Sequence, residues 1–212
     1  MVDVKKGDLV RMEYTGRVAS TGQVFDTTDE PLAREAGIFE KSASYGPKLA
    51  LFGQNAIMRG MEEAIASSQL GKKEEFLISP GKAFGNKQPE LTRVLSEKEF
   101  AKQGVQPIQG MLVTLDGKPA KIKSVTSGRV VADFNHPLAG ESVLYSLTVI
   151  EVISEPGEKI GAILGSVGIA AGVSQPGGKF SISFSKSDPP EKVEAAKRAI
   201  STAVPGAEFT VS

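Results

Sequence analysis

Residues 142–153, SVLYSLTVIEVI, are the stretch on which the fold depends. Apolar and polar side chains alternate along it, which is typical of a β-strand with one buried face. The stretch LVRMEYTGRV, residues 9–18, alternates in the same way, with Val10, Met12 and Tyr14 on one side. Because both patterns suit the same kind of sheet, we predict that these two segments pair, although most of the chain separates them.

The block before residue 142 has a pattern of its own, over about residues 87–133. Ser96 and Glu99 form a capping box in front of an apolar position, which predicts a short helix. Asp116-Gly117 between two apolar segments predicts the tip of a β-hairpin. We therefore expect a small β-rich unit, inserted into a sheet that resumes after it.

The first part of the chain predicts further strands in QVFDTT, LALF and EEFLISP. Residues 56–70 carry apolar side chains at helical spacing, and Gly71 follows as a stop signal. Residues 28–48 contain several prolines and glycines and are expected to be irregular.

Residues 156–212 follow a linker-like Glu-Pro-Gly-Glu run and differ in character from the rest. The pattern predicts a helix up to about Val167, a strand in KFSISFS, a helix capped by Asp188, and a last strand in EFTV. This order indicates a small α+β domain.

Four glycines in this part are spaced three or four residues apart, at Gly161, Gly165, Gly168 and Gly172. Such spacing lets another element approach a helix closely. Two alternatives stay open: packing within the domain, or contact with a second copy or a partner. The run does not match a dinucleotide fingerprint, because no strand leads into it.

Composition excludes several classes of function. Lys plus Arg and Asp plus Glu number 25 each, so neither nucleic acid nor a membrane is expected as a partner. The chain has no cysteine and one histidine, His136, which argues against a metal site, and we expect no cofactor. The charged N-terminus lacks the apolar core of a signal peptide, so we expect a cytoplasmic location.

Four motifs, in this order, resemble the FKBP-type peptidyl-prolyl cis/trans isomerases. They are VFDTT at 24–28, IMRGMEEA at 57–64, KAFG at 82–85, and NHPLAG leading into VLYSLTV at 135–149. The block that interrupts them resembles the insert-in-flap module of the SlyD-like subgroup. The long 28–48 segment and the extra C-terminal part look most like the long archaeal members.

The resemblance covers about residues 4–153 and implies an α+β fold. Its main part is an antiparallel sheet wrapped on a short helix. The expected domains are an isomerase domain from 1–86 and 134–155, an insert-in-flap domain from 87–133, and a C-terminal α+β domain from 156–212.

The implied activity needs no reactive side chain. Rotation about an X–Pro bond meets a barrier of about 18–20 kcal/mol because amide resonance is lost. A roughly 10⁴-fold acceleration requires only about 5.5 kcal/mol. An apolar pocket suffices if it disfavours the planar, charge-separated amide and holds the twisted form.

The resemblance also implies the site. It assigns catalytic roles to Tyr14, Phe25, Asp26 and Phe84, and substrate binding to Ile57, Met58, Met61, His136, Leu138, Ala139 and Tyr145. Three positions depart from the family pattern. Met61 replaces the tryptophan of many members, Phe84 replaces a tyrosine, and Tyr145 replaces a phenylalanine. Losing the phenol at Phe84 is expected to weaken carbonyl binding by on the order of 1 kcal/mol.

Each of these residues has an ordinary alternative. Asp26 could cap a turn with Thr27 and Thr28, and the aromatic residues could be plain core. His136 is expected to brace its loop by a hydrogen bond, with substrate contact as the second alternative. Apolar residues of the insert either form its own core or bind unfolded chains; they are Leu91, Val94, Leu95, Met111 and Val113.

The sequence thus predicts a prolyl isomerase with an attached chaperone module. Its expected partners are unfolded or partly folded proteins and proline-containing peptides, with macrolide inhibitors as candidate ligands. The alternative is a chaperone or peptide-binding module whose isomerase pocket is vestigial, given Met61 and Phe84.

Overall fold

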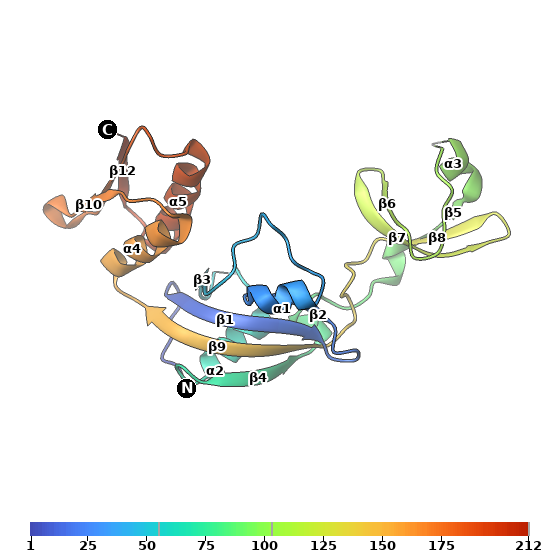
Figure 1. Ribbon diagram of the computed structural model, residues 1–212, viewed down its shortest axis with the longest axis horizontal. Coiled ribbons are helices and arrows are strands. Elements are labelled where there is room, and N and C mark those ends of the chain that lie inside the picture. The colour runs from blue at the N-terminus through green and yellow to red at the C-terminus, as the bar shows by residue number, and fades with distance from the viewer. Residues whose placement is uncertain (55, 103, 212) are drawn as a thin grey trace. The chain divides into compact units, whose positions relative to one another are not determined.

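The computed structural model describes residues 1–54, 56–102 and 104–211. The chain divides into two compact units (Figure 1). The first unit comprises residues 1–83 and 142–212, and the second comprises residues 84–141. Each unit has its own sheet or sheets and its own buried residues.

The main sheet of the first unit is antiparallel. β9 (Val143–Ile153) pairs with β1 (Leu9–Val18) along the whole length of β1 and lies between β1 and β4 (Lys73–Ile78). The other edge of β1 pairs with β2 (Val24–Thr27) at one end and with β3 (Lys48–Leu51) at the other. The predicted pairing of residues 142–153 with residues 9–18 is confirmed.

One helix, α2 (Arg59–Ser67), packs against this sheet through Met61, Ala64 and Ile65, which are buried. It is shorter than the predicted 56–70 at both ends. Met58 is the N-cap residue in an extended conformation, and Ser68 ends the helix with its hydroxyl donating to the Ala64 carbonyl at 2.8 Å. A 3₁₀ turn, η1 (Pro80–Lys82), follows β4.

The expectation that residues 28–48 are irregular is wrong at their start, where α1 (Glu30–Glu35) forms. Asp29 caps it by accepting the Leu32 N–H at 3.0 Å, and Pro31 lies in its first turn. Both are favourable helix-start features. The high proline and glycine content of residues 28–48 led us to overlook these two features in the sequence.

The C-terminal part is α+β, as expected. Two helices, α4 (Pro156–Val167) and α5 (Pro190–Ala203), accompany a sheet of β10 (Gly172–Ser174), β11 (Ser181–Phe184) and β12 (Glu208–Val211), with η3 (Pro176–Gly178) before β11. Asp188 does not cap α5. Its carboxylate accepts the Ser185 N–H at 3.0 Å, so it closes the preceding turn instead.

The C-terminal part shares a core with the main sheet. Leu9 and Ile153 from the sheet belong to the same buried cluster as Ile160 and Ile163 of α4. The Lys159 ammonium, almost fully buried, donates to the Gly7 carbonyl at 2.6 Å and lies 3.6 Å from the Asp8 carboxylate. The division into a separate 156–212 domain therefore stays a prediction.

Packing within the domain is wrong as the explanation for two of the glycines, whereas contact with a second copy or a partner stays a prediction. Gly161 and Gly165 are exposed, and a Cβ added to either would meet nothing within 4 Å. Gly168 instead ends α4 in the left-handed conformation (φ 68°), and Gly172 begins β10.

The second unit is built on a four-stranded sheet in the order β5-β8-β7-β6. Its elements are η2 (Pro89–Leu91), β5 (Thr92–Ser96), α3 (Glu97–Lys102), β6 (Leu112–Leu115), β7 (Lys118–Thr126) and β8 (Arg129–Asp133). The hairpin tip at Asp116-Gly117 is confirmed, with φ angles of 51° and 73°. The strand β5 was not predicted.

No helix in the described ranges is long and apolar enough to cross a membrane.

Candidate active site

An open pocket of about 350 Å³ lies on the first unit, where α2 faces the main sheet. Six residues predicted for the site line it: Tyr14, Asp26, Ile57, Met58, Met61 and Tyr145. They come from β1, β2, the start of α2 and β9. Strand pairing and helix packing have thus brought together residues that are far apart in the sequence.

Four further residues line this pocket and were not predicted: Met12, Lys48, Leu49 and Ala50. The last three belong to β3, which pairs with β1 so that Lys48 lies opposite Met12. The pairing of β3 with β1 was not predicted, so these β3 residues could not be recognised as lining of the pocket. We refer to this pocket as the prolyl pocket, after the role that the sequence resemblance predicts for it.

Three aromatic rings pack together beside the pocket. Tyr145 is only 2% exposed, and its ring centroid lies 5.9 Å from that of Tyr14 and 5.8 Å from that of Phe25. The Phe25 ring meets Tyr145 edge-on, at 84°. Gly16 permits this arrangement, because a Cβ there would lie 2.7 Å from the Phe25 ring. The sequence analysis did not identify Gly16.

Asp26 lies between two hollows. It lines the prolyl pocket and also a neighbouring hollow of about 260 Å³, which Phe25, Tyr14 and Lys48 line as well. Its carboxylate accepts hydrogen bonds from the Tyr14 hydroxyl and the Thr27 N–H. The half-buried carboxylate therefore faces space that a ligand could fill.

The turn-capping alternative for Asp26 stays a prediction beside the site role, because its carboxylate accepts the Thr27 N–H. The Thr28 hydroxyl accepts the Tyr14 N–H at 3.0 Å, and the Thr27 hydroxyl bonds that of Thr15 at 2.8 Å. Both threonines therefore stabilise the pairing of β2 with β1 through side-chain hydrogen bonds. The cap in this region is Asp29, which serves α1.

Burial sets the protonation of this site. It raises the pKa of the Asp26 carboxyl above its ordinary value, although the bonds from Tyr14 and Thr27 and the Lys48 charge oppose the change. Burial, together with the nearby Asp26 charge, raises the pKa of Tyr14 to about 12. The same causes raise the pKa of Tyr145. Both tyrosines keep their protons at neutral pH, so Tyr14 can donate to Asp26.

The floor and one end of the pocket belong to α2. Met61 is 4% exposed and presents its thioether side chain to the pocket. The Met58 carbonyl accepts the N–H groups of Met61 and Glu62 at 3.0 and 3.2 Å. The Met58 N–H has no hydrogen-bond partner in the described part of the chain, so it is available to a carbonyl placed there.

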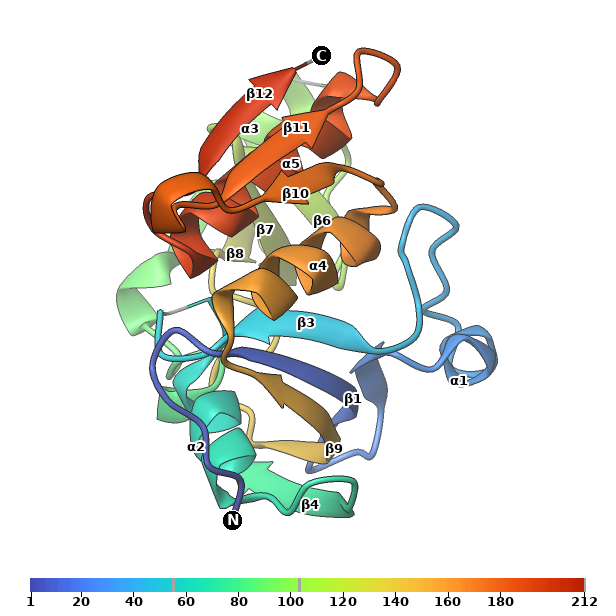
Figure 2. The ribbon, with the colours of Figure 1, turned by 90° about the vertical axis from the view of Figure 1, so that its left-hand side faces the viewer.

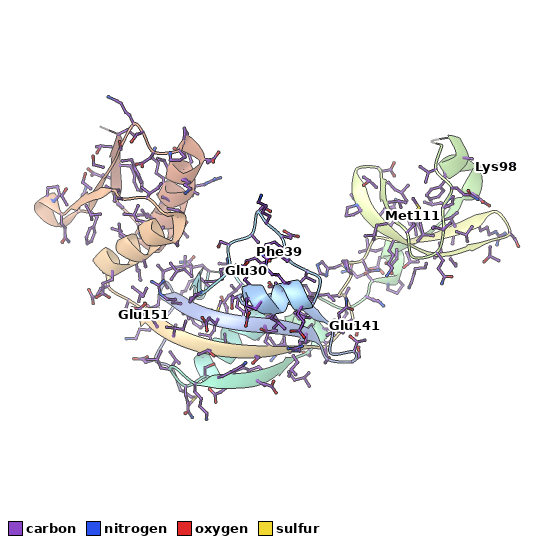
Figure 3. The ribbon with its side chains drawn as sticks, viewed as in Figure 1. Glu30, Phe39, Lys98, Met111, Glu141 and Glu151 are labelled. Atoms are coloured by element: carbon purple, nitrogen blue, oxygen red, sulfur yellow. The ribbon has the colours of Figure 1, made fainter. Side chains whose placement is uncertain are left out.

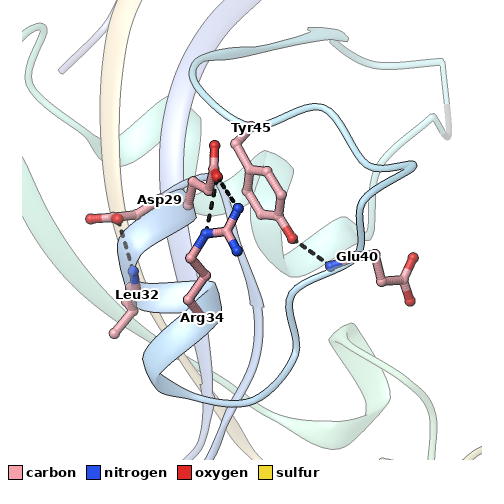
Figure 4. Close-up of polar contacts among 6 residues, drawn as sticks. Asp29, Leu32, Arg34, Glu40 and Tyr45 are labelled. Atoms are coloured by element: carbon pink, nitrogen blue, oxygen red, sulfur yellow. Dashed lines mark hydrogen bonds and ion pairs between the residues drawn. The ribbon is translucent and has the colours of Figure 1, made fainter.

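The 28–48 segment contributes most of the lining of the hollow beside Asp26. Figure 4 shows polar contacts within this segment. The Arg34 guanidinium lies 3.5 Å from the centre of the Phe39 ring, and Phe39 stacks on Tyr45 at 5.5 Å. The Tyr45 hydroxyl accepts the Glu40 N–H at 3.0 Å. Phe39 lies close to α1 (Figure 3). These contacts give a segment with little regular structure a defined shape.

The other four predicted site residues belong to the second unit. Phe84 and His136 stack with ring centroids 4.7 Å apart and planes at 4°. His136 Nδ1 accepts the Leu138 N–H at 3.1 Å, which is the expected bracing bond. Ala139 is 2% exposed, and its N–H donates to the His136 carbonyl. Their place at the rim of the pocket stays a prediction.

The apolar residues predicted in the insert have different environments. Leu95, Met111 and Val113 pack against the buried core of the second unit, and Leu91 is half-buried. Val94 is 65% exposed. Ile108 and Leu112, at 62% and 72%, are exposed as well and were not predicted.

Within the described ranges, no group of three or more His, Asp or Glu side chains is arranged to hold a metal ion.

Comparison with known proteins gives matches to both units. A family model described as FKBP-type peptidyl-prolyl cis-trans isomerase matches residues 2–109, and one described as FKBP26, IF domain, matches residues 93–138. The chain is 34% identical over 149 residues to the short-type peptidyl-prolyl cis-trans isomerase of Methanocaldococcus jannaschii, covering 70% of this chain and 94% of that protein.

Bacterial proteins are similar as well. The chain is 31% identical over 127 residues to the FKBP-type 16 kDa peptidyl-prolyl cis-trans isomerase of Escherichia coli, covering 57% of this chain and 85% of that one. It is 30% identical over 125 residues to the FKBP-type peptidyl-prolyl cis-trans isomerase SlyD of Helicobacter pylori, covering 55% and 66%. All three relatives carry the same activity in their names.

Proposed function

This chain belongs to the FKBP-type peptidyl-prolyl cis-trans isomerases, and we propose that the prolyl pocket is the place where it rotates X–Pro bonds. One observation carries the proposal. Residues from four separate segments, each predicted for the site, line a single pocket beside a half-buried carboxylate.

The pocket offers the physical means for this reaction. The proline ring enters between Met61, Ile57 and Tyr145, where water is displaced from around the amide. A planar amide carries partial charges on oxygen and nitrogen, which twisting about the C–N bond reduces. A weakly polar environment therefore raises the energy of the planar form more than that of the twisted form.

Two polar groups complete the mechanism. The Met58 N–H binds a substrate carbonyl next to the reacting bond and holds the chain in place. The Asp26 carboxylate, oriented by Tyr14, lies beside the carbonyl that turns. Its negative charge repels the planar amide oxygen more strongly than the twisted one, because the twisted oxygen carries less charge.

A protease-free assay on a Leu-Pro tetrapeptide tests this proposal. Asp26→Asn removes the charge while keeping the shape, and we expect kcat/KM to fall by roughly tenfold, about 1.4 kcal/mol of transition-state stabilisation. Asp116→Asn, at the exposed hairpin tip of the second unit, is the matched control and should keep full activity. A folded Asp26→Asn protein with wild-type turnover would contradict the assignment.

The same assay separates the alternative function. A vestigial pocket predicts no acceleration by the wild-type chain, while aggregation of an unfolded client is still suppressed.

The second unit supports a chaperone role as an additional proposal. Val94, Ile108 and Leu112 are exposed on a unit of small size, and large apolar side chains on a surface favour binding of other apolar chains. The proposed partners are unfolded or partly folded proteins that contain proline. Macrolide inhibitors as ligands and a cytoplasmic location also stay proposals.

A further inference from the structure

A second groove, larger than the prolyl pocket, lies on the first unit between α4 and the main sheet. Its volume is about 970 Å³, against about 350 Å³ for the prolyl pocket. Its lining is Arg11, Ser44, Tyr45, Pro47, Lys48, Leu49, Glu151, Ile153, Glu158, Gly161, Ala162, Gly165 and Ser166. We call it the α4 groove.

The α4 groove and the prolyl pocket meet at β3, which contributes lining residues to both. Lys48 and Leu49 line both, and Ser44, Tyr45 and Lys48 also line the hollow beside Asp26. β3 pairs with β1 along one edge, and no strand among the described residues pairs with its other edge. α4 lies alongside β3 (Figure 2). A chain leaving the prolyl pocket over β3 would enter this groove.

The wall formed by α4 consists mostly of small residues. Its lining residues recur at a spacing that places them on one helix face, and they are small beyond Glu158. Glycine within a helix costs about 0.8–1.0 kcal/mol relative to alanine. At Gly161 and Gly165 no close contact requires glycine, since an added Cβ would meet nothing within 4 Å. The effect of these glycines is to leave the groove unfilled.

The charges of the groove suit a polypeptide better than a simple ion. Arg11 and Glu151 form an ion pair at 3.0 Å, and Lys48 and Glu158 add one charge of each sign. Glu151 lies near the end of β9, close to where α4 begins (Figure 3). Leu49 and Ile153 add apolar surface between the charged residues. Mixed charge beside apolar surface and an unpaired strand edge matches an extended peptide with ordinary side chains.

We infer that the α4 groove holds the substrate polypeptide that continues from the X–Pro bond, so that the C-terminal part extends the substrate site. The inference rests on the proposed function of the prolyl pocket. Binding energy from the flanking chain then contributes to catalysis at the proline, which a tetrapeptide is too short to exploit.

The test compares substrates of different length. The first substrate is a Leu-Pro tetrapeptide. The second extends it by about six residues on its N-terminal side, and the third by about six residues on its C-terminal side, which is roughly 20 Å of extended chain. We expect one of the longer peptides to show a kcat/KM about tenfold above that of the tetrapeptide, because remote contacts stabilise the transition state.

A matched pair of variants locates the effect. Gly165→Trp places a large side chain in the groove, and it should reduce the length preference to within about twofold while leaving the tetrapeptide rate unchanged. Ser201→Trp makes a tryptophan at an exposed position of α5 that does not line the groove, and it should keep the preference. The amide NMR signals of Gly161 and Gly165 in the wild-type chain should shift when the longer peptide is added.

Any of three results would overturn the inference while the proposed function stands. One is an equal rate for short and long peptides, with tetrapeptide isomerisation intact. The second is a length preference that survives in Gly165→Trp. The third is that the amide signals of Gly161 and Gly165 do not move. Absence of tetrapeptide isomerisation by the wild-type chain would instead refute the proposed function, and this inference with it.

Discussion

The two units use apolar residues in opposite ways. In the first unit, Met61 and Tyr145 are 4% and 2% exposed, and both line the prolyl pocket. In the second unit, Val94 and Leu112 are 65% and 72% exposed. The same class of side chain thus lines a pocket in one unit and lies on the surface of the other, in line with the two roles that we propose.

The difference follows from how each sheet is covered. The main sheet has α2 packed against it. In addition, Leu9 of β1 and Ile153 of β9 share a core with the C-terminal part. The second unit has a short α3, and the core cluster beneath its sheet consists, among the described residues, of Phe100, Ala120, Ile122, Val130 and Ala132. A unit of this size buries a smaller fraction of its surface than a larger domain does, so some apolar side chains remain exposed.

The largest expected effect tests whether buried and exposed positions of the second unit differ as sharply as the structure indicates. Ile122→Ala removes a fully buried side chain, and the free energy of unfolding of this unit should fall by about 2–5 kcal/mol. Leu112→Ala, on the neighbouring strand but exposed, should change it by less than about 0.5 kcal/mol. Amide hydrogen exchange in the second unit measures both. If both variants lost the same unfolding free energy, the distinction between the core of the second unit and its proposed client-binding surface would be wrong.

A smaller effect is expected when the second unit is deleted, and it distinguishes isomerisation of a short peptide from catalysis of refolding. Replacing about residues 88–132 by a short glycine-containing loop should leave tetrapeptide isomerisation within roughly tenfold. Catalysis of proline-limited refolding should fall by about a further tenfold, because captured clients no longer raise the concentration of prolines near the pocket. Both rates are measured on the same two proteins.

A substitution variant controls for the deletion. Changing Val94, Ile108 and Leu112 to serine keeps the fold of the second unit and should reproduce the loss in refolding. The chaperone proposal is wrong if the deletion lowers both activities by the same factor.

The smallest effect concerns the ionisable groups of the two units. Burial raises the pKa of Tyr14 to about 12, so the folded state holds this proton more tightly than the unfolded state does. The resulting stability is fully present below about pH 10 and is lost as the pH rises towards 12. The fall in unfolding free energy across this range should be shallower in Tyr14→Phe. Denaturant titrations at each pH measure it, and parallel curves for the two proteins would contradict the burial argument.

In the second unit the corresponding shift has the opposite direction. Burial alone would raise the pKa of Asp133, but bonds from Asn135 and the Lys123 ammonium hold it below the usual range. The first unit therefore tolerates poorly compensated polar groups at its pocket, while the second unit pairs its buried carboxylate.

Much of the fold and part of the site were predictable from the sequence. Alternation in residues 9–18 and 142–153 indicated the central strand pair, because a half-buried strand has a strict two-residue period. The lining by Lys48, Leu49 and Ala50 was not predictable, since it depends on which strand β3 joins. Alternation in β6 also could not show that Leu112 is exposed, because nothing local tells which face of the sheet a core covers.

The position of β9 in the main sheet has a consequence for synthesis on the ribosome. β9 lies between β1 and β4, yet it is the last strand of that sheet to leave the ribosome. At about 5–20 residues per second, β1 waits on the order of ten seconds for its partner. The hairpins of the second unit need only neighbouring residues and can form meanwhile. We therefore expect a nascent chain to have a surface for clients before it has a pocket for proline.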